Sequence, residues 1–497
     1  MTQQQIDWRA RAQALALPRQ AFIDGRFVTA RAGKTYEVIN PADGLAIGQL
    51  PECDSGDVDN AVRSARRAFD SGVWCSMTPH ARKKTLLKLA ALVEKNRTEL
   101  ALLDTLTMGM PIAVSNGYCV QWAVNALEWY AESIDKVYGE VAPTDRSTVA
   151  TITREPVGVV GVVLPWNWPM GLMGWKIPPA LACGNSIVLK PDEQTSLSAL
   201  RFAELAQEAG IPEGVINIVT GGAATGEALG RHMDVDVITF TGSTETGKRF
   251  LKYSAESNMK PVWTECGGKG PNIVFADAPD LQVAARTAAL SIFLNTGQVC
   301  AAASRLIVEE SVREEVLETI KAVGKSLTPA DPLEANTMLG PLAKAAQLDR
   351  VVGYIEAGRK EGATLVAGGD RARTDCGGYF IEPTVFDGVH NEMRIAQEEI
   401  FGPVLATISF TSADEALSIA NASVYGLSGA VWTNNLSRAH RFAGALRCGS
   451  VTVNGYGDDA HDITVPFGGY KQSGFGRDKS LHALDKYLQL KTTWIKL

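Results

Sequence analysis

The spacing of hydrophobic positions changes near residue 157 of this chain. Before that point, apolar residues recur at helical spacing, which predicts helices over 57–70, 79–95 and 100–107. A short apolar run at 22–28 has an Asp-Gly pair at its centre, which predicts a hairpin. Beyond residue 157, brief apolar runs alternate with amphipathic stretches, so this part of the chain is predicted to alternate strands with helices.

The alternating region predicts a parallel sheet covered by helices. Its predicted strands span 157–164, 186–190, 215–219, 237–241 and 272–275. Its predicted helices span 171–181, 197–208, 224–231 and 244–253. Strands that are joined by helices pair in parallel through right-handed crossovers. Because open sheets of this kind bind ligands beyond the carboxyl ends of their strands, the side chains that follow these strands are the first candidates for a site.

A second α/β segment is predicted between roughly residues 280 and 480. Its predicted strands span 305–308, 428–432 and 450–453. The chain then ends in a strand-like stretch at 487–495. Two interpretations of this stretch stay open: an edge strand of its own sheet, or a strand that pairs with another subunit.

Length and composition narrow the class of protein. With 497 residues the chain is too long for one small core, which predicts two or three domains. The net charge of -7 comes without a basic stripe, so nucleic acid is not an expected partner. The N-terminus lacks a signal-peptide pattern, and the most apolar stretch, 157–164, is too short to span a membrane. A cytoplasmic location without a membrane partner is therefore expected.

Cys300 is the strongest candidate for chemistry among the eight cysteines. No two of them have the C-x-x-C spacing of a zinc site, and eight in a chain of this length do not indicate a disulfide scaffold, so no metal is expected. A single free cysteine more often packs as a small hydrophobe. Three other unusual segments, at 165–169, 264–269 and 398–403, offer partners to Cys300, and together they indicate a thiol-based enzyme.

Two of these segments supply a candidate hydrogen-bond donor and a candidate base. Asn167 lies between Pro165 and Pro169, which stiffen its loop, so its amide is suited to hold a developing oxyanion. The alternative is a turn residue that bonds its own backbone. Glu265 follows apolar residues, and a partly apolar pocket would raise its pKa toward neutrality, as a general base needs. The alternative is an ordinary surface glutamate.

The run 237–248 reads as a strand, a glycine turn and a helix start that would present free N–H groups to a phosphate. The alternative is a plain turn that uses Gly242 for its geometry. Arg249 stands where a P-loop needs Ser or Thr, which argues against a P-loop nucleotide hydrolase. Lys190 and Glu193 follow a predicted strand, where Glu193 would accept bonds from a ribose diol and disfavour a 2′-phosphate; the alternative is a solvated loop.

Taken together, the motifs resemble those of the NAD(P)-dependent aldehyde dehydrogenase superfamily, over nearly the whole chain from residue 22 to 497. The matching motifs are Pro165-Trp166-Asn167 and the segments 240–243, 265–269, 295–300, 399–403 and 466–477. Segments 129–140 and 476–484 are most similar to gamma-glutamyl-gamma-aminobutyraldehyde and guanidinobutyraldehyde dehydrogenases. The resemblance implies a cytoplasmic oxidoreductase that turns an aldehyde into an acid through a thioester.

The resemblance also assigns roles to individual residues. Cys300 would be the nucleophile and Glu265 the general base, Asn167 and the backbone N–H of Cys300 would form the oxyanion hole, and Lys176 would support this network. The cofactor would be NAD, with NADP as the alternative. Its implied contacts are Pro165, Trp166, Lys190, Glu193, Gly222, Gly242, Ser243, Gly247, Glu399 and Phe401. Taken singly, Glu399 is better explained as a charge at a helix end.

The implied fold is α/β: an open parallel cofactor domain, an α/β catalytic domain and a β-arm for oligomerisation. The cofactor domain would comprise 1–135 and 156–266, the catalytic domain 267–483, and the arm 136–155 and 484–497. The implied partners are a small-molecule aldehyde and further copies of the chain, as a homodimer or homotetramer.

The substrate is the least constrained part of this interpretation. Trp168 stands where Phe is usual in the family, and the loop 455–465 is about two residues longer than in the similar subfamily. Trp168, Trp175, Asp458 and Asp459, with Asp462 nearby, are the candidate substrate contacts. Acidic anchors would suit an amino- or guanidino-substituted aldehyde. The alternative is that the acidic loop is simply solvated and that the substrate is an aromatic or hydroxylated aldehyde or a broad range of aldehydes. Two other classes of enzyme stay open: a CoA-acylating dehydrogenase, against which Glu265 argues, and a thiol hydrolase.

Overall fold

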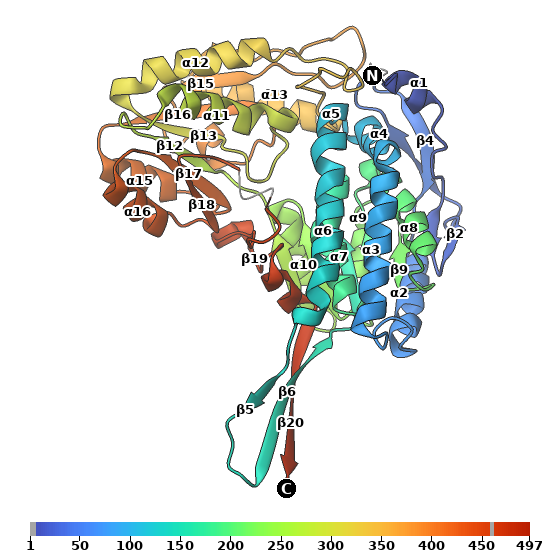
Figure 1. Cartoon of the computed structure of the whole chain (residues 1–497). Coiled ribbons are helices and arrows are strands. Elements are labelled where there is room, and N and C mark those ends of the chain that lie inside the picture. The colour runs from blue at the N-terminus through green and yellow to red at the C-terminus, as the bar shows by residue number, and fades with distance from the viewer. Residues whose placement is uncertain (1–5, 458–461) are drawn as a thin grey trace, which may run out of the picture.

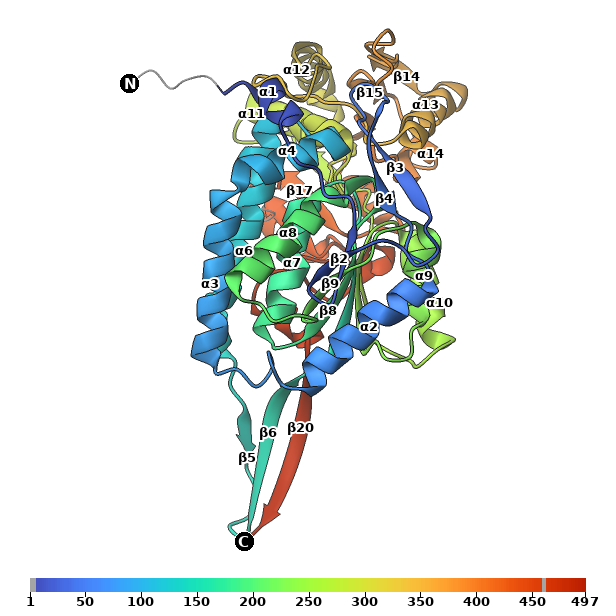
Figure 2. The same cartoon turned by 90° about the vertical axis from the view of Figure 1, so that its right-hand side faces the viewer.

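A computed structural model describes residues 6–457 and 462–497 of the chain. Two α/β lobes stand side by side, and a thin β-arm projects from the region between them (Figures 1 and 2). The first lobe is built on an eight-stranded sheet of order β19-β11-β10-β7-β8-β9-β1-β2. Its strands are β1 (Ala21–Ile23), β2 (Arg26–Val28), β7 (Val159–Val163), β8 (Ser186–Lys190), β9 (Ile216–Ile218), β10 (Val237–Thr241), β11 (Val262–Glu265) and β19 (Gly474–Phe475).

The five central strands of this sheet run parallel, and only its edges are antiparallel. Every residue of β7, β8 and β10 is buried, because helices cover both faces of the sheet, so these strands carry continuous apolar runs. The helices of this lobe are α2 (Ser55–Asp70), α3 (Pro79–Lys95), α4 (Arg97–Met108), α6 (Val120–Ser133), α7 (Pro169–Ala182), α8 (Leu197–Ala209), α9 (Ala223–Arg231) and α10 (Thr244–Ala255).

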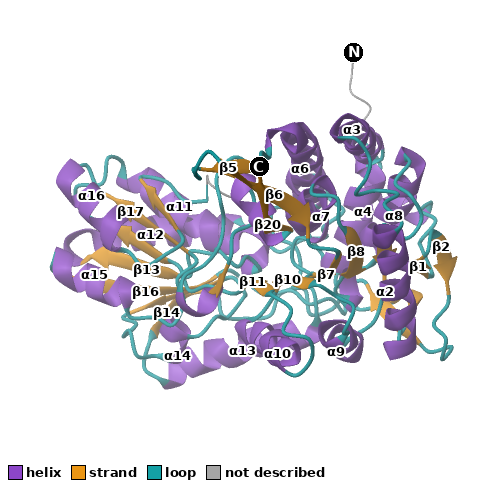
Figure 3. Ribbon diagram, turned by 90° about the horizontal axis from the view of Figure 1, so that it is seen from below, coloured by secondary structure: helices purple, strands orange, loops and turns teal. Residues whose placement is uncertain are grey.

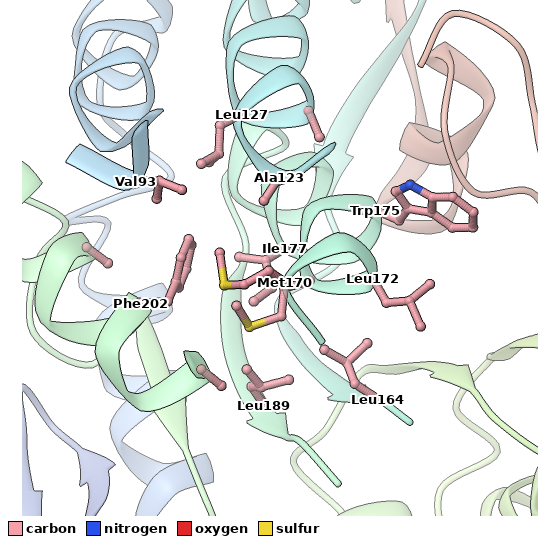
Figure 4. Packing of buried hydrophobic residues seen from close by; sticks show 14 of the residues in the cluster. Val93, Ala123, Leu127, Leu164, Met170, Leu172, Trp175, Ile177, Leu189 and Phe202 are labelled. Carbon is pink, nitrogen blue, oxygen red and sulfur yellow. The ribbon is translucent and has the colours of Figure 1, made fainter. Parts of the chain in front are cut away.

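Helix α7 is the centre of the first lobe's core. All of its residues are buried, since α3, α6 and α8 pack around it on the side away from the sheet. Figure 4 shows Met170 and Ile177 of α7 between Leu189 of the sheet and Leu127 of α6. A helix that is apolar on every side must be buried, and this one fixes the loop that precedes it.

The second lobe repeats the architecture with a seven-stranded sheet of order β14-β15-β16-β13-β12-β17-β18 (Figure 3). Its strands are β12 (Pro271–Val274), β13 (Arg305–Glu309), β14 (Thr364–Ala367), β15 (Thr384–Asp387), β16 (Val404–Phe410), β17 (Ser428–Trp432) and β18 (Ser450–Val453). Its longer helices are α11 (Leu281–Phe293), α12 (Arg313–Ser326), α13 (Ala345–Lys360), α15 (Ala413–Asn421) and α16 (Leu436–Ala445).

The arm is a three-stranded antiparallel sheet of order β20-β6-β5. Its strands are β5 (Glu140–Ala142), β6 (Thr148–Pro156) and β20 (Leu488–Lys496). The strand predicted at 487–495 is therefore confirmed as β20, and within the chain it pairs along its whole length with β6. The remaining elements include an antiparallel hairpin of β3 (Thr35–Ile39) and β4 (Ala46–Pro51). They also include the short helices α1 (Trp8–Gln13), α5 (Ile112–Val114) and α14 (Arg394–Gln397).

Candidate active site

A cavity of about 380 Å³ lies between the two lobes and brings together residues from seven separate segments of the chain. Its walls are Pro165, Trp166, Asn167, Thr241, Gly242, Ser243, Thr244, Glu245, Glu265, Gly267, Cys300, Gln347, Arg350, Glu399, Phe401 and Tyr425. The three candidates for chemistry that the sequence suggests, Cys300, Glu265 and Asn167, thus share one cavity.

Cys300 follows a strained turn that is held against its surroundings. Asn295 and Thr296 have φ values of 50° and 55°, and Gly297 has 72°. A Cβ on Gly297 would lie 2.1 Å from the backbone oxygen of Gly402, so only glycine fits there. The buried side chain of Gln298 braces the turn by donating to the oxygen of Asn295 at 3.0 Å. A strained backbone fixed this firmly holds the Cys300 loop in one position.

Asn167 is tied to that same loop. Its Nδ2 donates to the backbone oxygen of Gln298 at 2.9 Å, and its own backbone oxygen accepts from Nδ2 of Asn295 at 2.9 Å. The hydrogen bonds of Asn167 therefore run to the Cys300 loop, as a positioned donor requires. The alternative interpretation expected its side chain to bond the backbone of its own turn. One N–H of the amide remains beyond the bond to Gln298.

The start of α7 fixes the other side of the Asn167 loop. The backbone N–H of Met170 donates to Oδ2 of buried Asp104 at 3.2 Å, and that of Gly171 donates to Sγ of Cys119 at 3.3 Å. These bonds satisfy N–H groups that the first turn of a helix leaves without intrahelical partners.

Glu265 ends β11 as a buried carboxylate, not as a surface glutamate. Among the described residues, its oxygens make no hydrogen bond of ordinary geometry, and the one side chain that acts on its pKa as a hydrogen-bond donor is the thiol of Cys300. Burial raises the pKa of Glu265 to about 8, against the opposing attraction of Lys176. An ionised carboxylate with so few partners is costly to bury, so this group exchanges a proton near neutral pH, as a general base must.

The thiol of Cys300 is held in its neutral form. Burial raises its pKa well above the usual value, and the negative charges of Glu265 and Glu399 add to the shift. A thiol in this setting becomes a nucleophile only when a neighbouring base accepts its proton. Glu265 is the candidate base that lines the same cavity.

Behind Glu265 lies a buried group of three charged residues. Nζ of Lys176 donates to Oδ2 of Asp478 at 2.9 Å and to Oγ1 of Thr239 at 3.3 Å. Nζ of Lys486 donates to the other carboxylate oxygen of Asp478. Lys176 therefore acts on Glu265 through its charge, and Asp478 and Lys486 join a group in which the sequence motifs had suggested only Lys176.

A second cavity, of about 310 Å³, opens at the carboxyl ends of β7, β8 and β10. Of the residues expected to hold a cofactor, it is lined by Pro165, Trp166, Lys190, Glu193, Gly222, Gly242 and Ser243. Pro165, Trp166, Gly242 and Ser243 line both cavities, so the two adjoin. Gly247 lies deeper in α10, where a Cβ would come within 2.9 Å of Sγ of Cys266.

The paired cavities fit a dinucleotide. At their shared wall, Ser243 caps α10 by accepting from the backbone N–H of Thr246 at 3.2 Å, so the positive end of this helix faces the cavity, as a phosphate requires. Glu193 lies at one end and Glu399 at the other. Both are carboxylates that can accept bonds from ribose hydroxyls.

Glu399 is positioned by two glycines and a strained neighbour. Its Oε1 accepts from the backbone N–H of Gly268 at 3.0 Å, and burial raises its pKa to about 7. A Cβ on Gly267 would fall 2.0 Å from its Oε2. Phe401, with a φ of 61°, packs against Trp166 in a T-shaped arrangement with 5.3 Å between the ring centroids. The motif's glycines thus permit the close approach of Glu399.

The candidate substrate residues Trp168 and Trp175 belong to an aromatic group completed by Trp122 and Phe467. Trp122 lies 4.8 Å from Trp168 and 6.1 Å from Trp175, and Phe467 lies 5.1 Å from Trp175, between ring centroids. Cys300 packs against the same hydrophobic cluster. Asp458 and Asp459 lie outside the described residues.

Asp462, the third acid of that loop, is exposed and engaged locally. Its Oδ1 accepts from the backbone N–H and the hydroxyl of Thr464, at 2.8 and 2.7 Å. The described part of the loop therefore gives no support to an acidic anchor at Asp462.

Several wall residues carry no signal in the sequence. Gln347 and Arg350 come from α13 and Tyr425 from the loop after α15, in segments that read as ordinary helices and connections. Gln347 donates to the backbone oxygen of Phe401 at 2.8 Å, and Arg350 donates to that of Glu399 at 2.7 Å. Gln347 and Arg350 therefore support the loop that carries Glu399.

The sequence profile of the aldehyde dehydrogenase family matches residues 27–493. The chain therefore belongs to the aldehyde dehydrogenase family and is an enzyme of that class, and the resemblance stated from its motifs is confirmed. It is 49% identical, over 99% of its own length and 98% of the relative's, to the NADP/NAD-dependent aldehyde dehydrogenase PuuC of Escherichia coli (strain K12).

Solved structures agree with the fold. The chain shares 53% identity and a TM-score of 0.97, with 99% of both chains covered, with an indole-3-acetaldehyde dehydrogenase in complex with NAD+. It shares 50% identity, the same TM-score and the same coverage with the gamma-glutamyl-gamma-aminobutyraldehyde dehydrogenase of Burkholderia cenocepacia J2315. The predicted α/β aldehyde dehydrogenase fold is confirmed.

Proposed function

We propose that this enzyme oxidises an aldehyde to the carboxylic acid through a thioester on Cys300, with NAD as cofactor and NADP as the alternative. The observation that carries this proposal is the shared cavity in which Cys300 meets a buried carboxylate, Glu265, and a fixed amide, Asn167.

The first step forms a bond between the Cys300 sulfur and the carbonyl carbon while the thiol proton passes to Glu265. The carbonyl oxygen takes up the electron pair of the broken π bond and accepts hydrogen bonds from the remaining Asn167 N–H and the backbone N–H of Cys300. Removing one such donor costs about 10²–10³ in rate in other enzymes. The rigid turn before Cys300 keeps sulfur and donor in one geometry.

When bound, the nicotinamide supplies the acceptor for the hydride that leaves the substrate carbon. Glu399, Phe401 and Trp166 would hold that end of the cofactor, and Lys190 and Glu193 the adenosine ribose. Once the proton taken from Cys300 has passed from Glu265 to solvent, Glu265 takes a proton from water, whose oxygen attacks the thioester. The carbon–sulfur bond breaks, the acid leaves, and Glu265 returns the proton to the Cys300 sulfur. The position of Glu265 in the same cavity as Cys300 supports water, and not coenzyme A, as the acceptor.

For substrate, we propose an amino- or guanidino-substituted aliphatic aldehyde. A similar enzyme is named for gamma-glutamyl-gamma-aminobutyraldehyde, and Trp122, Trp168 and Trp175 belong to the cluster on which Cys300 packs, where an indole ring would attract a cation that reached it. The anchors at Asp458 and Asp459 stay a prediction. A second candidate is an aromatic aldehyde, which the same three indole rings would stack upon and which a similar enzyme is named for.

A substitution at the thiol tests the chemistry. We expect Cys300→Ala to abolish NADH formation while NAD+ still binds, and Cys376→Ala, at a partly buried cysteine outside the cavity, to keep wild-type turnover. Absorbance of the reduced nicotinamide reports turnover and calorimetry reports binding. Dehydrogenase activity that persists in Cys300→Ala overturns the proposed role. Esterase activity does not separate the classes, because a thioester-forming cysteine also cleaves esters.

A panel of aldehydes tests the substrate. We expect kcat/KM for amino- and guanidino-aldehydes to exceed that for propanal by about tenfold or more, and Trp122→Leu to remove most of this margin while leaving propanal unchanged. Indole-3-acetaldehyde as the best substrate would favour the second candidate. Equal values for cationic and neutral aliphatic aldehydes would exclude the first.

The division of the chain is also a proposal. The first lobe would be the NAD-binding domain, the second the catalytic domain, and the sheet of β5, β6 and β20 the arm of a homodimer or homotetramer. Within the described ranges, no helix has the length and apolar character needed to cross a membrane. The cytoplasmic location stays a prediction.

A further inference from the structure

One cation of the second lobe reaches across to the cofactor cavity of the first. Lys344 directly precedes α13 in the second lobe. Its Nζ lies 2.9 Å from Oε1 of Glu193 and 2.8 Å from Oδ1 of Asp192, in the loop that follows β8. No motif of the sequence points to this lysine, and the chemistry proposed above does not use it.

Lys344 completes a group of two cations and two anions at the edge of the cavity. The remaining oxygen of Glu193, Oε2, lies 4.0 Å from Nζ of buried Lys190, so the carboxylate sits between two lysines. Asp192 is fixed in turn, because its Oδ1 accepts from the backbone N–H of Gln194 at 2.9 Å. The charges of Lys190, Lys344, Asp192 and Glu193 add up to zero.

The state of Glu193 decides what the ribose end of the cavity accepts. A free carboxylate there accepts bonds from the 2′-hydroxyl and repels a 2′-phosphate. Burial acts to raise the pKa of Glu193, but the positive charges of Lys344 and Lys190 outweigh burial and keep the pKa below its usual value. The carboxylate therefore stays ionised and paired with these two lysines. One of its oxygens is bonded to Lys344, and its charge is balanced.

We propose that Lys344 determines the choice between NAD and NADP, because it holds and neutralises Glu193 and thereby lets the site take a 2′-phosphorylated dinucleotide as well as an unphosphorylated one. The proposal rests on the proposed function of this cavity as the NAD site. Without Lys344, the group of Lys190, Asp192 and Glu193 carries a net charge of -1, which repels the doubly charged 2′-phosphate and leaves the diol contact intact.

The test uses ligands that lack nicotinamide, so that it does not depend on turnover. Calorimetry gives Kd for ADP-ribose and for 2′-phospho-ADP-ribose, and the ratio of the second to the first measures discrimination. One charge removed within about 7 Å, at an effective dielectric constant of about 20, predicts a rise of about tenfold or more in this ratio for Lys344→Met. Lys344→Arg, which keeps the charge, should change it by less than about threefold.

Lys252→Met is the matched control, since it removes the same charge from an exposed site on α10 that pairs with Glu256 and does not line the cavity. It should leave the ratio unchanged. A second variant tests the route: in Glu193→Gln the phosphorylated ligand should bind more tightly, and adding Lys344→Met to it should have a smaller effect than in the wild type.

A ratio that changes by less than about threefold in Lys344→Met overturns the proposal. So does a wild type that binds ADP-ribose but not its 2′-phosphate, because Glu193 would then exclude the phosphate despite Lys344. A wild type that binds neither ligand contradicts the proposed cofactor site itself, and the inference about Lys344 falls with it.

Discussion

At the scale of single residues, the proton of Glu265 sets an expected pH dependence. Only the ionised carboxylate can take a proton from water, and its raised pKa of about 8 keeps it protonated below that pH. The rate of acid release should therefore rise as pH increases through about 8. Single-turnover release of acid from the acylated enzyme measures this rate, and Glu265→Gln should abolish the rise.

Glu256→Gln, at an exposed carboxylate that is paired with Arg231 on the surface, should keep the wild-type profile. A profile that stays flat from pH 6 to 9 in the wild type would exclude Glu265 as the base of this step.

The same shift predicts how stability depends on pH. Because the folded-state pKa of Glu265 is raised from 4.5 to about 8, folding favours the protonated form. Its contribution is fully present below pH 4.5 and is lost as pH rises through about 8, up to about 5 kcal/mol at the alkaline end. Tm should fall between pH 6 and 9 more steeply in the wild type than in Glu265→Gln. Parallel curves for the two proteins would contradict the assigned pKa.

Sequence reasoning found the residues whose types are unusual in their context. Cys300, Glu265 and Asn167 each follow a strand or a glycine-rich or proline-bounded loop, and chemistry gives a reason for each type. Lys344 and Trp122 were not found. A lysine before a helix reads as solvated, and a tryptophan within a helix reads as core, so only the fold reveals that one faces Glu193 and the other Trp168.

At the scale of elements, three segments meet at Asp478: helix α7 brings Lys176, the loop after β19 brings Asp478, and the 3-10 helix Leu481–Lys486 brings Lys486. Two buried cations share this one carboxylate. Removing the anion leaves both cations uncompensated, which costs about 3–5 kcal/mol in comparable buried pairs. Removing Lys486 leaves the pair of Lys176 and Asp478 balanced.

We therefore expect Asp478→Asn to lower Tm strongly and Lys486→Met to lower it little, as measured by thermal unfolding of the holoenzyme. Asp478 also raises the pKa of Glu265, so in Asp478→Asn the pH profile of acid release should move to lower pH. Equal losses of stability in the two variants would show that the charge balance at Asp478 does not matter.

The sequence patterns predicted elements well where both faces of a strand are buried. The strands expected at 186–190 and 237–241 coincide with β8 and β10, because continuous apolar runs between helices allow few other interpretations. Strand β6 was expected only from the family resemblance, which implied a β-arm over 136–155, and the hydrophobic pattern alone did not predict it. Its residues do not alternate strictly between polar and apolar, and its partner β20 follows more than 300 residues later, so nothing near it in the sequence predicts the pairing.

At the scale of the whole molecule, the arm lacks a core of its own. Figures 1 and 2 show β5, β6 and β20 projecting from the lobes, with none of the described helices against either face. Leu490, Trp494 and Ile495 of β20 and Val141 of β5 are exposed by 63%, 65%, 49% and 73%. Apolar side chains that are exposed together on a thin projecting sheet indicate a contact surface for another molecule.

Another copy of this chain is the cover we propose, and a charge placed on the arm tests it. Trp494→Glu should lower the mass measured by size-exclusion chromatography with light scattering, because burying an unpaired carboxylate costs several kcal/mol and removes a large apolar contact. Leu436→Glu, at a leucine exposed by 73% at the start of α16, makes the same kind of change away from the arm and should leave the mass unchanged. The proposal fails if the wild type is a monomer or if Trp494→Glu keeps the wild-type mass, because the apolar residues of β20 would then serve another contact. A lower mass with an unchanged Tm of the lobes would support an assembly interface on the arm.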